Sequence, residues 1–100
     1  MSEEVRVLLY HRTEDADGVL AAYHATSSRL AGVDGLYANE FLHSVHDPAG
    51  FVVVSSWRSL DAFVEWEQGA SHRSSTAPLR PYRDAGMSRP FGVYRVLAAH

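Results

Sequence analysis

Four polar or aromatic side chains recur at every second position near the middle of the chain. They are Tyr37, Asn39, Phe41 and His43. Alternate residues of a β-strand point to the same face, so a strand here would present all four together. Histidine can accept a proton near neutral pH, and an amide or phenol can donate a hydrogen bond to a developing oxyanion. The row is therefore a candidate pocket lining, and a solvent-facing row or a contact between subunits is the alternative interpretation.

Two tryptophans and a histidine form a second candidate group. Trp57 ends an apolar run, Trp66 follows Phe63 at helical spacing, and His72 lies shortly beyond. Tryptophan either fills a core or lines a pocket, and both roles stay open for Trp57 and Trp66. His72 has the chemistry of a proton shuttle near neutral pH, with a solvated surface position as the alternative. Trp66 is the better pocket candidate of the two tryptophans.

Several other chemistries are excluded or disfavoured by residue type. The chain has no cysteine, and all nine of its basic residues are arginine. Disulfides, thiolate metal sites and lysine Schiff bases are therefore excluded. His43 and His46 lie three residues apart beside Asp47, but a stable metal site needs three or four convergent ligands, and a polar hairpin tip explains the same residues. We expect neither a metal nor a cofactor.

The elements that would position these residues follow from hydrophobic spacing and from breaker residues. Apolar or β-branched runs predict strands over 5–11, 36–45, 51–57 and 91–97. Helical spacing predicts one helix over 16–31, with Thr13 or Asp15 as N-cap and Gly32 at its end, and a second helix after the N-cap Ser59. The second helix should break near Gly69 and resume weakly through His72. The prolines that follow predict an irregular segment.

This order of elements predicts an α+β fold of ferredoxin-like βαββαβ type. Its four-stranded antiparallel sheet would carry both helices on one face. Strands 5–11 and 51–57 are apolar on both sides, as is most of 91–97, so the other face needs a cover that the chain does not contain. A second copy of the chain is the simplest cover, and we expect a homodimer.

Length and composition limit the remaining possibilities. The 100 residues suit one domain, so we expect residues 1–100 to form a single core. The net charge is -3 and the basic residues are scattered, which disfavours nucleic-acid binding. No apolar stretch approaches the length of a membrane span, and the N-terminus is acidic rather than signal-like, so no membrane association and a cytoplasmic location are the expectation.

Several segments carry a resemblance to a known family. They are Ser56 to Trp66, Ser71-His72-Arg73, Pro78-Leu79-Arg80-Pro81-Tyr82 and the glycine turn Val33-Asp34-Gly35-Leu36. This sequence resembles the antibiotic-biosynthesis monooxygenase family, in which a strand ending in tryptophan precedes a helix carrying phenylalanine and tryptophan. The resemblance covers most of the chain. It implies a dimeric α+β barrel, and it leaves open which of the family's several activities applies.

Two branches of the family make different demands on the sequence. Haem-degrading members share Trp66 but also need an asparagine on the first strand and a ligand histidine where this chain has Ser75 and Thr76; haem degradation is therefore disfavoured. Cofactor-free oxygenases that convert polyketide anthrones to quinones share Trp57. In that branch an asparagine and a tyrosine stand where this chain has Val53 and Phe63, so other polar residues would have to serve here.

We therefore expect a cofactor-independent monooxygenase that uses dioxygen to oxidise an aromatic, polyketide-like or phenolic small molecule. A cyclase or isomerase working by proton transfer alone, and a non-catalytic dimeric ligand-binding domain, are the alternatives. The candidate catalytic residues are Trp66, His43, Asn39 and His72. The candidate substrate-binding residues are Tyr37, Trp57, Phe63, Tyr23, His24 and Tyr82. Tyr82 and Arg80 could close over a ligand or form a rigid connector.

Overall fold

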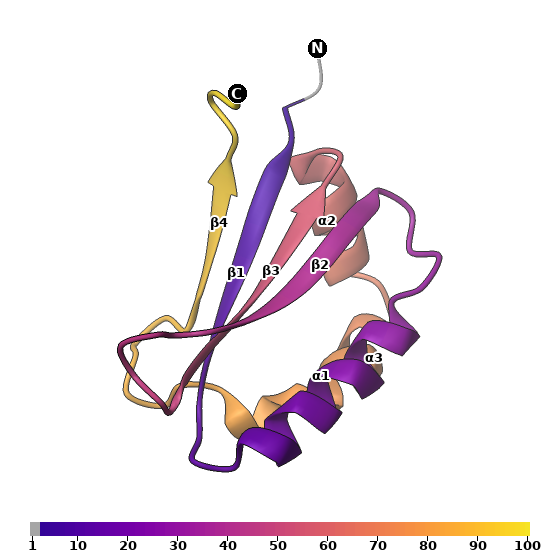
Figure 1. The fold of residues 1–100 in the computed structure, drawn as a ribbon. Helices are drawn as coiled ribbons and strands as arrows, with labels where there is room; N and C mark the ends of the chain where they lie inside the picture. Colours follow the sequence, from indigo (N-terminus) through magenta and orange to yellow (C-terminus); the bar gives the residue numbers. More distant parts are fainter. Residues whose placement is uncertain (1–2) are drawn as a thin grey trace.

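A computed structural model describes residues 3–100 and contains one four-stranded sheet with all helices on one side (Figure 1). The elements run in the order β1 (Val5–Arg12), α1 (Ala16–Arg29), β2 (Leu36–His43), β3 (Gly50–Trp57), α2 (Leu60–Glu67), α3 (His72–Thr76), the 3-10 helix η1 (Ala77–Tyr82) and β4 (Phe91–Arg95). The strand order is β2-β3-β1-β4 and each neighbouring pair is antiparallel. The predicted ferredoxin-like α+β fold is confirmed.

Capping side chains fix the starts of helices α1 and α2, and two glycines form the turn from α1 into β2. The Asp15 side chain caps α1 by accepting from the Gly18 N–H, and Ser59 caps α2 by accepting from the Ala62 N–H. Gly32 and Gly35 both have positive φ, a conformation that glycine adopts at little cost. They turn the chain from α1 into β2 within a few residues.

The structure corrects the predicted bounds in several places. The first helix ends at Arg29 and not at residue 31, β2 ends at His43 and not at 45, and β4 ends at Arg95 and not at 97. Helix α3 lies where a weak resumption near His72 was expected, but the first part of the proline-containing segment predicted as irregular forms η1 instead. Pro78 lies in the first turn of η1, where a missing N–H costs no hydrogen bond, which is why proline did not prevent a helix there.

Two clusters of buried side chains fill the space between sheet and helices. One surrounds Trp57 and Phe63 under α2, and the other surrounds Val19 and Leu79 under α1 and η1. In β1 and β3 the residues that face these clusters alternate with residues on the opposite face of the sheet. The region between the two clusters is hollow and forms the site described next.

Candidate active site

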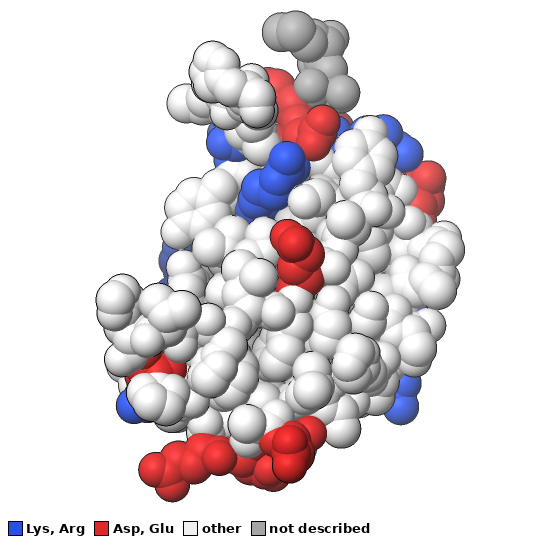
Figure 2. Space-filling model, viewed as in Figure 1, with Lys and Arg blue, Asp and Glu red and all other residues white. Residues whose placement is uncertain are grey.

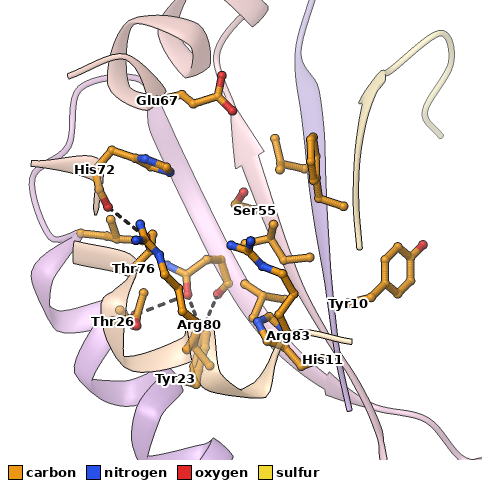
Figure 3. Close-up of a pocket in the computed structure, with 18 of the residues that line it drawn as sticks. Tyr10, His11, Tyr23, Thr26, Ser55, Glu67, His72, Thr76, Arg80 and Arg83 are labelled. Atoms are coloured by element: carbon orange, nitrogen blue, oxygen red, sulfur yellow. Dashed lines mark hydrogen bonds between the residues drawn. The ribbon is translucent and has the colours of Figure 1, made fainter. Parts of the chain in front are cut away.

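A cavity of about 230 Å³ lies between the helical layer and the inner face of the sheet. Its walls come from β1, β2 and β3 on one side and from α1, α2, α3 and η1 on the other, with Phe91 of β4 at its edge. Most of the lining is apolar, and a few polar side chains point into the space (Figure 3). A largely apolar cavity with a few placed polar groups is typical of small-molecule sites.

Three aromatic side chains form one wall of the cavity. Trp57 packs against Phe63 and Trp66 with ring centroids 5.4 Å and 5.2 Å apart. The Trp57 indole N–H donates to the Ser55 hydroxyl at 2.9 Å, whereas the buried Nε1 of Trp66 has no hydrogen-bond partner among the described residues. The two tryptophans of the wall therefore differ in hydrogen bonding: the Trp57 indole N–H is bonded inside the core, whereas the Trp66 indole N–H is available to a ligand.

His72 lies at the end of this wall. Its ring meets the Trp66 ring edge-on, with centroids 4.6 Å apart. Burial lowers the pKa of His72 below the ordinary histidine value, and Glu67 opposes that change while Arg80, Arg73 and Arg83 add to it. The imidazole is thus mostly neutral near pH 7 and able to accept a proton.

An amide and a phenol meet at another part of the cavity. The Tyr23 hydroxyl of α1 donates a hydrogen bond to the Asn39 side-chain oxygen and lies 3.3 Å from the Asn39 carbonyl oxygen. The Ser27 hydroxyl also donates to the Asn39 side chain at 3.3 Å. Tyr23 stacks on Phe41 with centroids 4.9 Å apart, which fixes the phenol against β2.

The β2 row predicted from alternation does not share one face throughout. A β-bulge between Leu36 and Ala38 leaves Tyr37 without a partner on β3, and its side chain is 59% exposed. Asn39 and Phe41 face the helices, but His43 lies beyond the cavity, stacked on Phe51 and with Nε2 2.9 Å from the Pro48 carbonyl oxygen. Of the row, only Asn39 lines the cavity.

Six of the ten predicted site residues line this cavity. They are Tyr23, Asn39, Trp57, Phe63, Trp66 and His72. His24 is exposed on α1, and Tyr82 packs against the Val19 cluster instead of the cavity. Val53 and Phe63, at which the resemblance implies an asparagine and a tyrosine for the cofactor-free branch, both line the cavity.

The cavity also contains polar residues that sequence reasoning missed. His11 and Thr26 are each 5% exposed and line the cavity, and within residues 3–100 His11 Nδ1 and Thr26 Oγ1 have no hydrogen-bond partner. Arg83, which follows η1, lines it too. The signal for His11 was its place in the alternation of Val5, Val7 and Leu9, which puts it on the inner face of β1. It was instead interpreted as the end of a strand.

Two other features of the described residues bear on function. Within residues 3–100, no group of three or more histidine, aspartate or glutamate side chains lies close enough to hold a metal ion. None of the helices formed by these residues is long and apolar enough to cross a membrane.

Comparison with known proteins identifies the family. The model of the antibiotic biosynthesis monooxygenase family matches residues 4–76, well over half of the chain. The chain belongs to this family. A curated relative, Protein SchA of Streptomyces halstedii, is 31% identical over 96 residues, which is 94% of this chain and 25% of SchA. The chain thus spans about a quarter of the length of that relative.

Solved structures share the fold. SnoaB, a cofactor-independent oxygenase from Streptomyces nogalater, matches with a TM-score of 0.79 and 14% identity over 99% of this chain and 97% of its own. A conserved protein from Methanosarcina mazei matches with a TM-score of 0.75 and 10% identity over 93% of this chain and 92% of its own. At such identities the likeness concerns the fold, so the activity must be argued from the cavity.

Proposed function

We propose that this domain is a cofactor-independent monooxygenase that oxidises an aromatic phenol or enol, such as an anthrone, in the cavity beneath the helices. The observation that carries the proposal is the combination of an aromatic wall with separate proton-accepting and hydrogen-bond-donating groups in one largely apolar space. In this reaction the substrate itself supplies the electrons. A methylene carbon becomes a carbonyl, one oxygen atom of dioxygen enters the product, and the other leaves as water with the two displaced hydrogens.

The lining residues can divide the work as this chemistry requires. Trp57, Phe63 and Trp66 would exclude water from the reactive carbanion and hold its aromatic rings. The Asn39 amide N–H would donate to the reduced oxygen as negative charge develops, and the Tyr23 phenol, which donates to the Asn39 side-chain oxygen, would hold that amide in place. They supply the same pair of groups, a phenol and an amide, that Val53 and Phe63 lack at the positions used by the cofactor-free branch. His72, beside Trp66, would exchange protons with solvent.

The experiment that tests this proposal is dissolved-oxygen consumption by chelator-treated protein with a panel of anthrones and naphthols. Uptake that survives chelation and falls strongly in Trp66→Phe and Asn39→Ala, but not in the hairpin-tip control His46→Ala, supports the oxygenase. Product formed without oxygen uptake would replace it with the cyclase or isomerase. Binding without product would replace it with a ligand-binding role, which the apolar Val53 and Phe63 favour.

We also propose that two copies pair through the outer face of the sheet. Across this face, Leu8 pairs with Val54, and Tyr10 and Leu42 flank Val52, so that apolar side chains are adjacent on all the central strands. Tyr94 of β4 is 54% exposed on the same face. Figure 2 shows charged side chains mainly toward the ends and edges of the molecule, with an acidic and a basic side chain on the area between them, and Glu40 lies on this face beside Val54. Apolar surface of this kind is typical of an interface.

A further inference from the structure

Two polar side chains to which no role has yet been assigned, His11 and Arg83, lie where β1 meets the segment that follows η1. His11 lies on the inner face of β1, and its buried Nδ1 atom has no hydrogen-bond partner among residues 3–100. A buried polar atom without a partner costs stability, so it is usually retained where a bound molecule or water satisfies it. His11 lines the cavity, which makes a bound substrate the fitting partner.

Arg83 is a charged group whose field acts on His11. The two residues form an isolated antiparallel β-bridge, and the neighbouring Asp84 N–H donates to the Tyr10 carbonyl at 3.0 Å, which fixes the backbone of both. Figure 3 shows the Arg83 side chain extending into the pocket beside His11. Arg83 has no acidic partner within ion-pair distance in the part of the chain described here. Its guanidinium is therefore available to an anion from outside.

The electrostatics of the pair favour one protonation state. Burial is the largest cause that lowers the pKa of His11, and the positive charge of Arg83 lowers it further, while a backbone contact with Leu9 acts in the opposite direction. His11 is consequently neutral at pH 7, with a nitrogen able to accept a proton. A negative charge placed next to Arg83 would offset the repulsion that an imidazolium at His11 would otherwise feel.

We propose that His11 accepts the hydroxyl proton of the phenolic substrate and that Arg83 binds the phenolate oxygen that this step creates. The inference rests on the proposed function, because it assigns the step that makes the substrate electron-rich enough to reduce dioxygen. The O–H bond of the phenol breaks, its proton forms an N–H bond at His11, and the electron pair stays on oxygen beside the guanidinium. The substrate class is accordingly an acidic phenol or enol, and the methyl ether of such a compound is not a substrate.

The test is an anaerobic absorbance titration of the protein with a naphthol at neutral pH, where the free naphthol is un-ionised and its ionised form absorbs at longer wavelength. We expect the wild-type protein to bind the naphthol as naphtholate. In His11→Gln and Arg83→Gln the ionised fraction of bound naphthol should fall at least about tenfold, since each loses a group that favours the anion. His46→Gln and Arg89→Gln, both exposed, should behave as wild type, and the methyl ether should produce no new band.

The outcomes separate this inference from the oxygenase proposal. Oxygen uptake with an undiminished naphtholate band in both variants would overturn the inference and leave the oxygenase standing. A naphtholate band that depends on His11 and Arg83, in a protein that consumes no oxygen, would support the inference and overturn the oxygenase. If His11→Gln fails to fold by circular dichroism, the exposed Arg83→Gln decides the matter.

Discussion

Replacing tryptophan by phenylalanine should have different effects at the two tryptophans of the cavity wall, on ligand affinity at Trp66 and on stability at Trp57. The Trp66 indole N–H is unpaired in the part of the chain that the structure describes, so Trp66→Phe removes a donor that is available to a ligand. We expect naphthol affinity to fall about two- to tenfold with little change in stability. Trp57 is 1% exposed and bonded to Ser55, so Trp57→Phe should instead lower the free energy of unfolding by about 1–3 kcal/mol. Titration calorimetry and urea unfolding of both variants measure the contrast, and equal losses of stability would contradict it.

The buried His11 and the half-buried His72 predict that acid destabilises the protein. The pKa values of His11 and His72 are lowered below the ordinary 6.5, so the unfolded chain binds more protons than the folded one in that range. The stability that depends on neutral histidine is therefore fully present above pH 6.5 and is lost as pH falls below it. Urea unfolding between about pH 8 and about pH 5 should show this loss.

A variant identifies the source of this pH dependence. His11→Gln should flatten the loss of stability with acidification, whereas His46→Gln should leave it as in wild type. The pKa values of Asp34 and Asp47 are lowered below 3.8 by hydrogen bonds from Arg58 and Arg12, so these carboxylates lose their contribution only in more acid solution. A slope unchanged in His11→Gln would show that burial of His11 does not govern it.

At the residue scale, what the sequence could predict depended on whether local geometry was regular. Alternation put Asn39 and Phe41 on one face of the strand without deciding whether that face met the helices, and it could not reveal the bulge that puts Tyr37 in solvent. Helical spacing placed Phe63 and Trp66 together correctly. His11 and Arg83 meet only because η1 returns the chain to β1, a long-range contact that no spacing encodes.

At the element scale, the turn between α1 and β2 provides a matched pair of glycines. Gly32 and Gly35 have φ values of 83° and 85°, so alanine is strained at both. A Cβ at Gly32 meets nothing within 4 Å, whereas one at Gly35 would lie 2.5 Å from the Cβ of Ala62 in α2. Gly32→Ala should therefore cost about 1–2 kcal/mol of stability. Gly35→Ala should cost about 1–3 kcal/mol more, because α2 must move.

Displacement of α2 gives this prediction a second readout. Since α2 carries Phe63 and Trp66, Gly35→Ala should also weaken naphthol binding, and Gly32→Ala should not. Urea unfolding and fluorescence titration of the two variants provide the measurements. Equal costs in stability and equal binding would mean that the contact between the turn and α2 is easily relieved.

Element prediction succeeded where a cap or a run of β-branched residues fixed the outcome. Ser59 and the 51–57 run are examples, and the observed α2 and β3 begin within one residue of expectation. It failed at residues 77–82, where proline was taken to exclude a helix. Packing of Leu79 into the core stabilises η1 there, and tertiary contact of this kind is absent from local propensity.

At the scale of the whole molecule, the apolar outer face of the sheet predicts that a single copy is incomplete. We expect the protein to sediment as a dimer at micromolar concentration. Val54→Glu places a carboxylate beside Leu8 and opposite Glu40, and Tyr94→Glu places one on β4, so either should weaken the dimer at least about thirtyfold. Val45→Glu, at a position 91% exposed on the hairpin, is the matched control and should remain dimeric.

Dimer formation should also affect the cavity, because the two faces of the sheet share the same strands. Leu8 on the outer face stands between Val7 and Leu9, both of which line the cavity, so a partner covering the outer face would hold the floor of the site in place. Monomeric Tyr94→Glu should therefore show weaker naphthol binding together with a lower melting temperature. A wild-type protein that sediments as a monomer would contradict the dimer. Variants that stay dimeric would place the interface on another surface.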